Sequence, residues 1–141
     1  MRLLFVCTGN TCRSPLAEAI ARREAIERGL ADVEVASAGT SAWEGAPASD
    51  GALLVALERS LDLSGHRAQM LTRELVERHD VILAMGPHHL ERAEALGGEG
   101  KTFLLSVFAA NAPSDRAISD PFGGDLEYPR PLRGELRGRP E

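Results

Sequence analysis

One short segment of the sequence combines a nucleophilic side chain with a fixed cation. Cys7 and Arg13 are separated by five residues, lie after the apolar run of residues 3–6 and precede Ser14 and Pro15, where we expect a helix to begin with Ser14 as its N-cap. A thiol that faces a helix N-terminus and a guanidinium is favoured as the thiolate. The pattern therefore predicts attack by Cys7 on a phosphoryl group whose oxygens Arg13 holds.

The segment has the features of a phosphate-binding loop but lacks the Gly-x-x-x-x-Gly-Lys-Ser/Thr pattern of nucleotide-binding loops. Gly9 and Asn10 suit the positive φ angles that a tight loop needs, and Ser14 is within reach of the sulfur as a hydrogen-bond donor. The alternative is a buried apolar Cys7 beside a surface Arg13, but the position between a strand and a helix favours the catalytic interpretation. The expected phosphate-binding residues are Thr8, Gly9, Asn10, Thr11, Cys12, Arg13 and Ser14.

The elements that must position this loop follow from apolar periodicity. Strands are predicted over residues 3–6, 33–36, 81–85 and 102–105, and the third of these is the clearest central strand. Helices are predicted from residue 14 to the turn at 29–32, over 48–61, after Thr72 as a cap, and over 87–96, with a loop at 37–40. The resulting βαβαβαβ order predicts an α/β three-layer sandwich, a four-stranded parallel sheet covered by helices on both faces and Rossmann-like in type.

Composition limits the classes of protein to which the chain can belong. Its 141 residues fit one domain, 1–141, and its net charge of −5 opposes a broad nucleic-acid surface. No apolar run reaches the length of a membrane span or a signal segment, so we expect a cytoplasmic protein without a membrane partner, and a monomer. Two cysteines five residues apart do not form a disulfide framework, and no Cys/His cluster predicts a metal. Adjacent His88 and His89 are predicted to be a solvated pair, because neighbours cannot share one helix face.

The loop closely resembles the active-site loop of the low-molecular-weight protein phosphatases. Residues 6–18, VCTGNTCRSPLAE, carry the resemblance, which is closest to the bacterial protein-arginine-phosphatase branch, and SAGTSAW, DLSGHRAQMLT and DVILAM resemble consecutive later landmarks. The resemblance implies the family's fold and a cysteine-dependent phosphatase that needs no metal or cofactor. It also implies a hydrogen-bonded network that keeps the loop rigid, formed by Asn10, Ser14, Ser37 and His66. Trp43, otherwise as well explained as a partly buried core residue, would form a wall of the substrate cleft.

The proton donor is expected near residue 120. Taken alone, Asp120-Pro121 followed by Phe122-Gly123-Gly124 is a turn, but the leaving group needs an acid that the loop lacks. The family supplies one from an Asp-Pro loop at this place, so the resemblance implies Asp120 as general acid and then general base for water. Asp115 and Asp125 are nearby competitors, and neither precedes a proline.

The expected substrates are phosphorylated proteins, with inorganic phosphate as product. Thr11 is small and polar where tyrosine-directed members usually carry a larger aliphatic residue, and Phe122 follows Asp-Pro where they carry tyrosines. Both features resemble the arginine-directed branch, so phosphoarginine is the first choice and phosphotyrosine the second.

Other classes and one redox question stay open at this point. Thioredoxin-coupled arsenate reductases share the fold but use an additional pair of cysteines, and Cys7 and Cys12 are the only two here. A non-hydrolytic phosphocarrier or an anion-binding module would need no Asp-Pro acid. Cys12 either protects Cys7 through a reversible disulfide or is a small buried filler. Two prolines and a glycine over residues 128–134 oppose the final helix that the family normally has.

Overall fold

A computed structural model describes residues 1–106 of the chain. Its four strands are β1 (Arg2–Cys7), β2 (Glu34–Gly39), β3 (Val81–Ala84) and β4 (Thr102–Leu104). The helices are α1 (Arg13–Glu27), α2 (Asp50–Glu58), α3 (Arg73–Arg78) and α4 (Pro87–Ala93), and α4 continues into a π-helical turn, η1 (Glu94–Gly98). No helix of this described part is long and apolar enough to cross a membrane.

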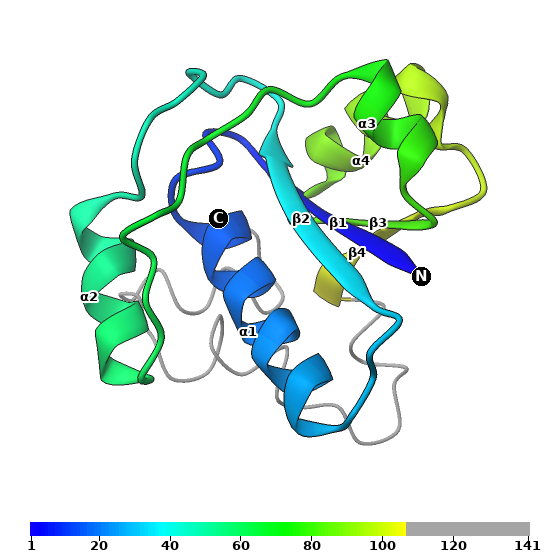
Figure 1. The fold of residues 1–141 in the computed structure, drawn as a ribbon. Coiled ribbons are helices and arrows are strands. Elements are labelled where there is room, and N and C mark those ends of the chain that lie inside the picture. Colours follow the sequence, from blue (N-terminus) through cyan, green and yellow to red (C-terminus); the bar gives the residue numbers. More distant parts are fainter. Residues whose placement is uncertain (107–141) are drawn as a thin grey trace.

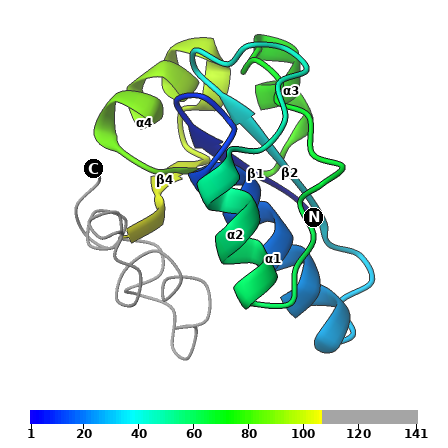
Figure 2. The same cartoon turned by 90° about the vertical axis from the view of Figure 1, so that its left-hand side faces the viewer.

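The strands form one parallel sheet in the order β2-β1-β3-β4. Figure 1 shows β1 inside the sheet, and Figure 2 shows α1 and α2 on one side with α3 and α4 on the other. The predicted three-layer arrangement is therefore confirmed. Because β1 lies between β2 and β3, the loop that follows it has strand ends on both sides.

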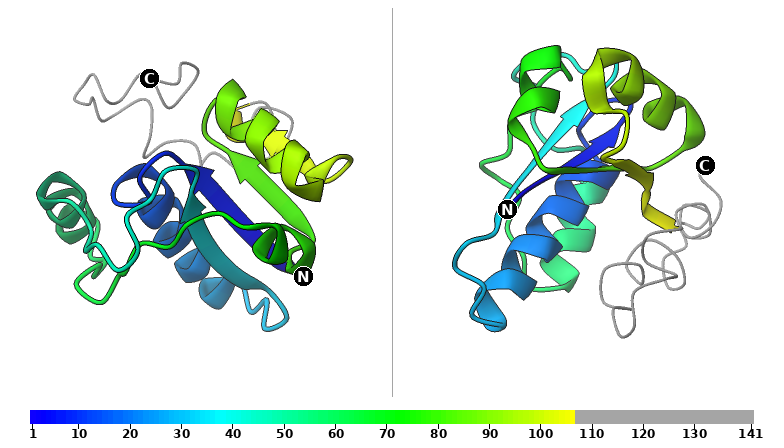
Figure 3. Two further views of the ribbon diagram at one scale, coloured as in Figure 1. Left: turned by 90° about the horizontal axis from the view of Figure 1, so that it is seen from above. Right: turned by 90° about the vertical axis from the view of Figure 1, so that its right-hand side faces the viewer.

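Alternation along β1 divides the core into two clusters, since successive side chains of a strand point to opposite faces. Phe5 and Cys7 pack with apolar side chains of α1 and α2, whereas Leu4 and Val6 pack with those of α3 and α4. The views in Figure 3 show the two helical layers on either side of the sheet. Each face thus has its own apolar contacts, and the sheet is buried between them.

Several predicted boundaries move by a few residues. The predicted loop at 37–40 is wrong in its first part, because β2 extends to Gly39 and pairs with β1 as far as Cys7. The predicted N-cap is also wrong: α1 begins at Arg13, which makes Ser14 its second residue and frees the hydroxyl for other partners. The caps that do accept backbone hydrogen bonds are Ser49 for α2 and Thr72 for α3.

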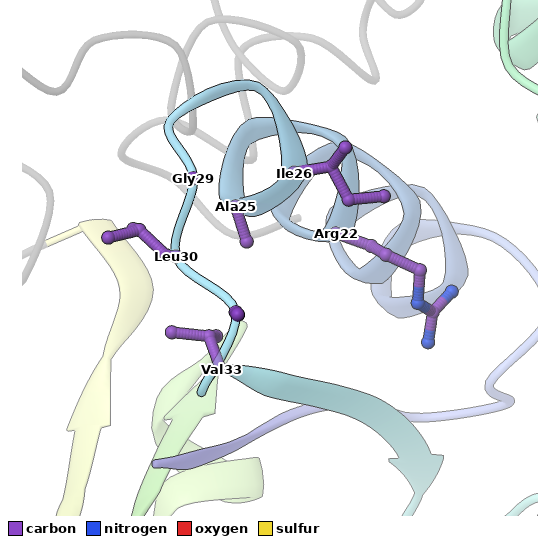
Figure 4. A pocket seen from close by; sticks show the side chains of 7 residues that line it. Arg22, Ala25, Ile26, Gly29, Leu30 and Val33 are labelled. Carbon is purple, nitrogen blue, oxygen red and sulfur yellow. The ribbon is translucent and has the colours of Figure 1, made fainter.

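The apolar pattern of the first helix runs past the helix itself. Leu30 belongs to that pattern but lies beyond the end of α1, and both Ile26 and Leu30 are exposed. They line a hollow of about 320 Å³ with Val33, at the end of α1 remote from the loop (Figure 4).

Candidate active site

Cys7 is the last residue of β1 and lies directly before the loop that joins β1 to the N-terminus of α1. The backbone N–H of Asn10 donates to Cys7 Sγ over 3.3 Å, and Ser14 Oγ is 2.9 Å from the same sulfur. Asn10 has a φ of 56°, the left-handed conformation that turns its N–H inward. Cys7 is 4% exposed, and Arg13 is half-buried at the first residue of α1. This arrangement places a nucleophile where free N–H groups and the helix dipole favour negative charge.

The side chain of Asn10 connects the loop to β2. It is fully buried, and its Nδ2 donates to Ser14 Oγ at 2.8 Å and to Ser37 Oγ at 2.9 Å, while its Oδ1 accepts the N–H of Gln69 at 2.9 Å. His66 Nε2 lies 2.7 Å from the carbonyl oxygen of Asn10. The structure thus brings together the four residues that the resemblance implied as loop support.

Gly39 allows the loop to approach β2 closely. A Cβ at this position would lie 2.4 Å from the carbonyl oxygen of Thr8 and 3.0 Å from the backbone nitrogen of Asn10. The N–H of Thr40 donates to the carbonyl of Cys7 at 2.9 Å, so the two backbones are also hydrogen-bonded here. Only glycine fits between the end of β2 and the loop.

The predicted solvated pair of histidines is wrong for His89. Its ring is fully buried, whereas His88 is exposed, and His89 Nε2 lies 2.8 Å from Thr8 Oγ1. Burial, together with the nearby positive groups of His88 and Arg13, lowers the pKa of His89 to about 4, so the ring is neutral at physiological pH. Its Nδ1 has no hydrogen-bond partner within residues 1–106. His89 therefore contacts the loop from the β3 side.

The remaining predicted residues lie around this centre. Trp43 is 83% exposed, so the alternative of a partly buried core residue is wrong, and its role as a wall of the substrate cleft stays a prediction. Cys12 is half-buried, whereas Cys7 is buried. The hydroxyl of Thr11 lies over Gly9, 3.5 Å from where a Cβ of that glycine would be. Asp120 and Phe122 lie outside the described residues, and their roles stay predictions.

The sequence reasoning missed four residues that contact the loop or its network: Glu18, Gly39, Gln69 and His89. Glu18 lies on the same helix as Ser14, four residues on, and this i,i+4 spacing was a usable signal for a shared helix face. Gly39 and His89 carried no local signal, because their importance depends on which strand ends flank β1.

Comparison with known proteins agrees with this geometry. A family model described as low molecular weight phosphotyrosine protein phosphatase matches residues 2–136. The protein-arginine-phosphatase of Geobacillus stearothermophilus is 41% identical over 137 residues, which cover 96% of this chain and 88% of the relative. The probable low molecular weight protein-tyrosine-phosphatase EpsP of Ralstonia solanacearum is 48% identical over 120 residues, or 85% and 77% of the two chains.

Solved structures give the same result. A YwlE arginine phosphatase, determined as a cysteine-to-serine mutant with a phosphorylated active-site serine, superposes with a TM-score of 0.77. It is 37% identical, and the match covers 97% of this chain and 89% of that one. The predicted resemblance is confirmed, and the protein belongs to the low molecular weight phosphotyrosine protein phosphatase family.

Proposed function

We propose that the protein hydrolyses phosphoarginine residues of proteins through a phosphocysteine on Cys7. The observation that carries the proposal is the position of Cys7 Sγ, which accepts the N–H of Asn10 and contacts Ser14 Oγ at the N-terminus of α1. A related arginine phosphatase was captured with a phosphorylated serine at its active site, which supports phosphoryl transfer to the corresponding side chain here.

The proposed reaction has two displacements. The Cys7 thiolate forms a bond to phosphorus while the bond from phosphorus to the guanidinium nitrogen breaks, and Asp120 gives its proton to that nitrogen. Asp120 then accepts a proton from water, whose oxygen attacks phosphorus and expels the Cys7 sulfur, so that inorganic phosphate leaves. Arg13 and the loop N–H groups balance the charge on the phosphoryl oxygens in both steps.

Two observations favour arginine over tyrosine. The arginine-directed relative from Geobacillus stearothermophilus aligns with 96% of this chain, against 85% for the tyrosine-directed EpsP. Thr11 also presents a small hydroxyl beside Gly9, on the loop where we expect the phosphoryl group to bind. The 48% identity to EpsP makes phosphotyrosine the second candidate. The two substrates differ in the leaving atom and in the planar group behind it, so the same loop can serve either.

Matched peptides that carry phosphoarginine or phosphotyrosine provide the test. We expect a higher kcat/KM on phosphoarginine, continued release of phosphate beyond one equivalent per protein, and loss of turnover in Cys7→Ala. A burst of a single equivalent would indicate a phosphocarrier, and equal or lower kcat/KM on phosphoarginine would favour the tyrosine alternative.

Two variants of Thr11 separate the effect of its hydroxyl from the effect of bulk. Thr11→Val removes the hydroxyl at nearly constant size, and Thr11→Ile also adds a methylene. If the hydroxyl orients the guanidinium or the attacking water, both variants lower phosphoarginine hydrolysis relative to phosphotyrosine hydrolysis by about tenfold, equivalent to about 1.4 kcal/mol. A fall only in Thr11→Ile would mean that pocket volume, not the hydroxyl, sets the preference.

A further inference from the structure

The hydrogen bonds behind the loop have a definite direction. Gln69 N can only donate, so it fixes the oxygen end of the Asn10 amide, and both hydrogens of Asn10 Nδ2 must point the other way. They go to Ser14 Oγ and Ser37 Oγ. Each serine hydroxyl thus receives a donor and has one hydrogen of its own left to give.

Glu18 takes the hydrogen of Ser37. Ser37 Oγ donates to Glu18 Oε1 over 2.6 Å, and a carboxylate can only accept. At the other branch, the hydrogen of Ser14 is left for Cys7 Sγ at 2.9 Å. The carboxylate and the sulfur are therefore the two acceptors at the ends of one network of donors.

Arg22 holds Glu18 in place. Its Nη2 lies 2.5 Å from Glu18 Oε2 and 2.8 Å from the carbonyl oxygen of Val35 in β2. Arg22 thus holds the carboxylate oxygen that Ser37 does not contact. Figure 4 shows the Arg22 side chain extending from α1 away from the apolar residues Leu30 and Val33. The Glu18 side chain is 18% exposed, and the positive charge of Arg22 offsets a negative charge that would otherwise oppose the thiolate.

We infer that Glu18, oriented by Arg22, is a positioning residue for the nucleophile, acting through Ser37 and Asn10. The inference rests on the proposed function, because it concerns how Cys7 is held for attack. A hollow of about 220 Å³ lies beside Glu18 and His66, behind the loop. Without the carboxylate, water from this hollow can replace it as the partner of Ser37, and water does not hold the hydroxyl in one place. Gln69 still fixes the direction of the Asn10 amide, but Ser37 and Asn10 are anchored less firmly, so the Ser14 hydroxyl is positioned less precisely against the sulfur.

Glu18→Gln is the test variant, since an amide keeps the size but can present a donor to Ser37. We expect kcat on an aryl phosphate to fall about tenfold, or about 1.4 kcal/mol, as for the loss of one hydrogen bond. KM and inhibition by inorganic phosphate should change little, because the loop N–H groups and Arg13 are intact. The pH at which iodoacetamide alkylates Cys7 should rise, because the hydrogen bond from Ser14 to the thiolate is weakened. A fall in that pH, which removal of a negative charge alone would cause, would overturn the inference.

The same helix offers a matched control. Glu24 pairs with Arg28 at the same i,i+4 spacing, 3.0 Å apart, further along α1. Glu24→Gln should leave kcat and the alkylation profile as in the wild type. If Glu18→Gln does not fold, Arg22→Met against Arg28→Met gives the same comparison, with a smaller fall in kcat expected for Arg22→Met. Wild-type kcat in Glu18→Gln, or a change in KM alone, would overturn the inference.

A double-mutant cycle tests the route of the effect. If Glu18 acts through Ser37, Glu18→Gln should have almost no effect in a Ser37→Ala background, whereas independent roles would make the two losses multiply. Alkylation of Cys7 needs no substrate, so this readout stands apart from the proposed activity. A wild type without turnover would defeat the proposed function, and an unchanged alkylation profile in Glu18→Gln would defeat the role of Glu18.

Discussion

Because His89 is buried in its neutral form, the free energy of unfolding should fall as the pH is lowered. Replacing His89 with a residue that does not titrate should remove this part of the pH dependence. In the unfolded chain the ring titrates near 6.5, and in the fold burial and the charges of His88 and Arg13 lower its pKa to about 4. Between these two pKa values, His89 is protonated in the unfolded chain but stays neutral in the folded protein. The contribution of neutral His89 is fully present above pH 6.5 and is lost as the pH falls from 6.5 towards 4.

The size of the effect follows from the two pKa values. A difference between 6.5 and about 4 corresponds to a loss of about 3 kcal/mol once both states are protonated. Between pH 7.5 and pH 5 the expected loss is about 2 kcal/mol, because at pH 5 the unfolded ring is charged and the folded ring is not. This is a large share of the stability of an ordinary domain.

Urea unfolding followed by circular dichroism, at pH 7.5 and pH 5, measures this loss for the wild type and for His89→Gln. Glutamine cannot be protonated but can place an amide nitrogen near Thr8 Oγ1, so the variant should lose about 2 kcal/mol less than the wild type between the two pH values. His88→Gln is the matched control, because His88 is exposed and should leave most of the pH dependence intact. Equal losses in wild type and His89→Gln would refute a neutral, buried His89.

Three further substitutions test the loop and its proton donor. Arg13→Lys should lower kcat/KM on phosphopeptides by about 10²-fold or more, because a point charge cannot replace the bidentate fork; kinetics close to wild type would place the phosphate elsewhere. Asp120→Asn should slow hydrolysis by about 10²–10⁴-fold for poor leaving groups and much less for p-nitrophenyl phosphate, and equal losses would point to a structural role. Gly39→Ala should cost about 1–3 kcal/mol in urea unfolding and lower kcat, because its Cβ would lie 2.4 Å from Thr8 O. Gly51→Ala, in open space on α2, should do neither.

The parts of the site that sequence reasoning predicted are those encoded within a single stretch of chain. Cys7 and Arg13 lie on one loop, so their meeting needs only a strand before and a helix after, and both are visible in the apolar pattern. The network of Asn10 with Ser37 and His66 required the family resemblance, since these residues come from separate segments. In the structure, Ser37 and His66 both lie within hydrogen-bonding distance of Asn10.

The burial of His89 could not be predicted from the sequence, because the residues next to it do not determine whether its side chain is buried. A polar pair after Pro87 is typical of an exposed first turn, and His88 behaves in this way. The second ring is buried because β3 lies directly beside β1, which places the first turn of α4 next to Thr8. Strand order is a long-range property, and the βαβ pattern alone allows several orders with the same right-handed crossovers.

The same strand order explains why the loop after β1, and not another, carries the nucleophile. Since β1 lies between β2 and β3, the loop receives Ser37 and Gly39 from one neighbour and His89 from the element that follows the other. The loop after an edge strand would have such support on one side only. Preorganised N–H groups lower a barrier only if they do not rearrange during the reaction, so the loop with rigid contacts on both sides suits charge stabilisation best.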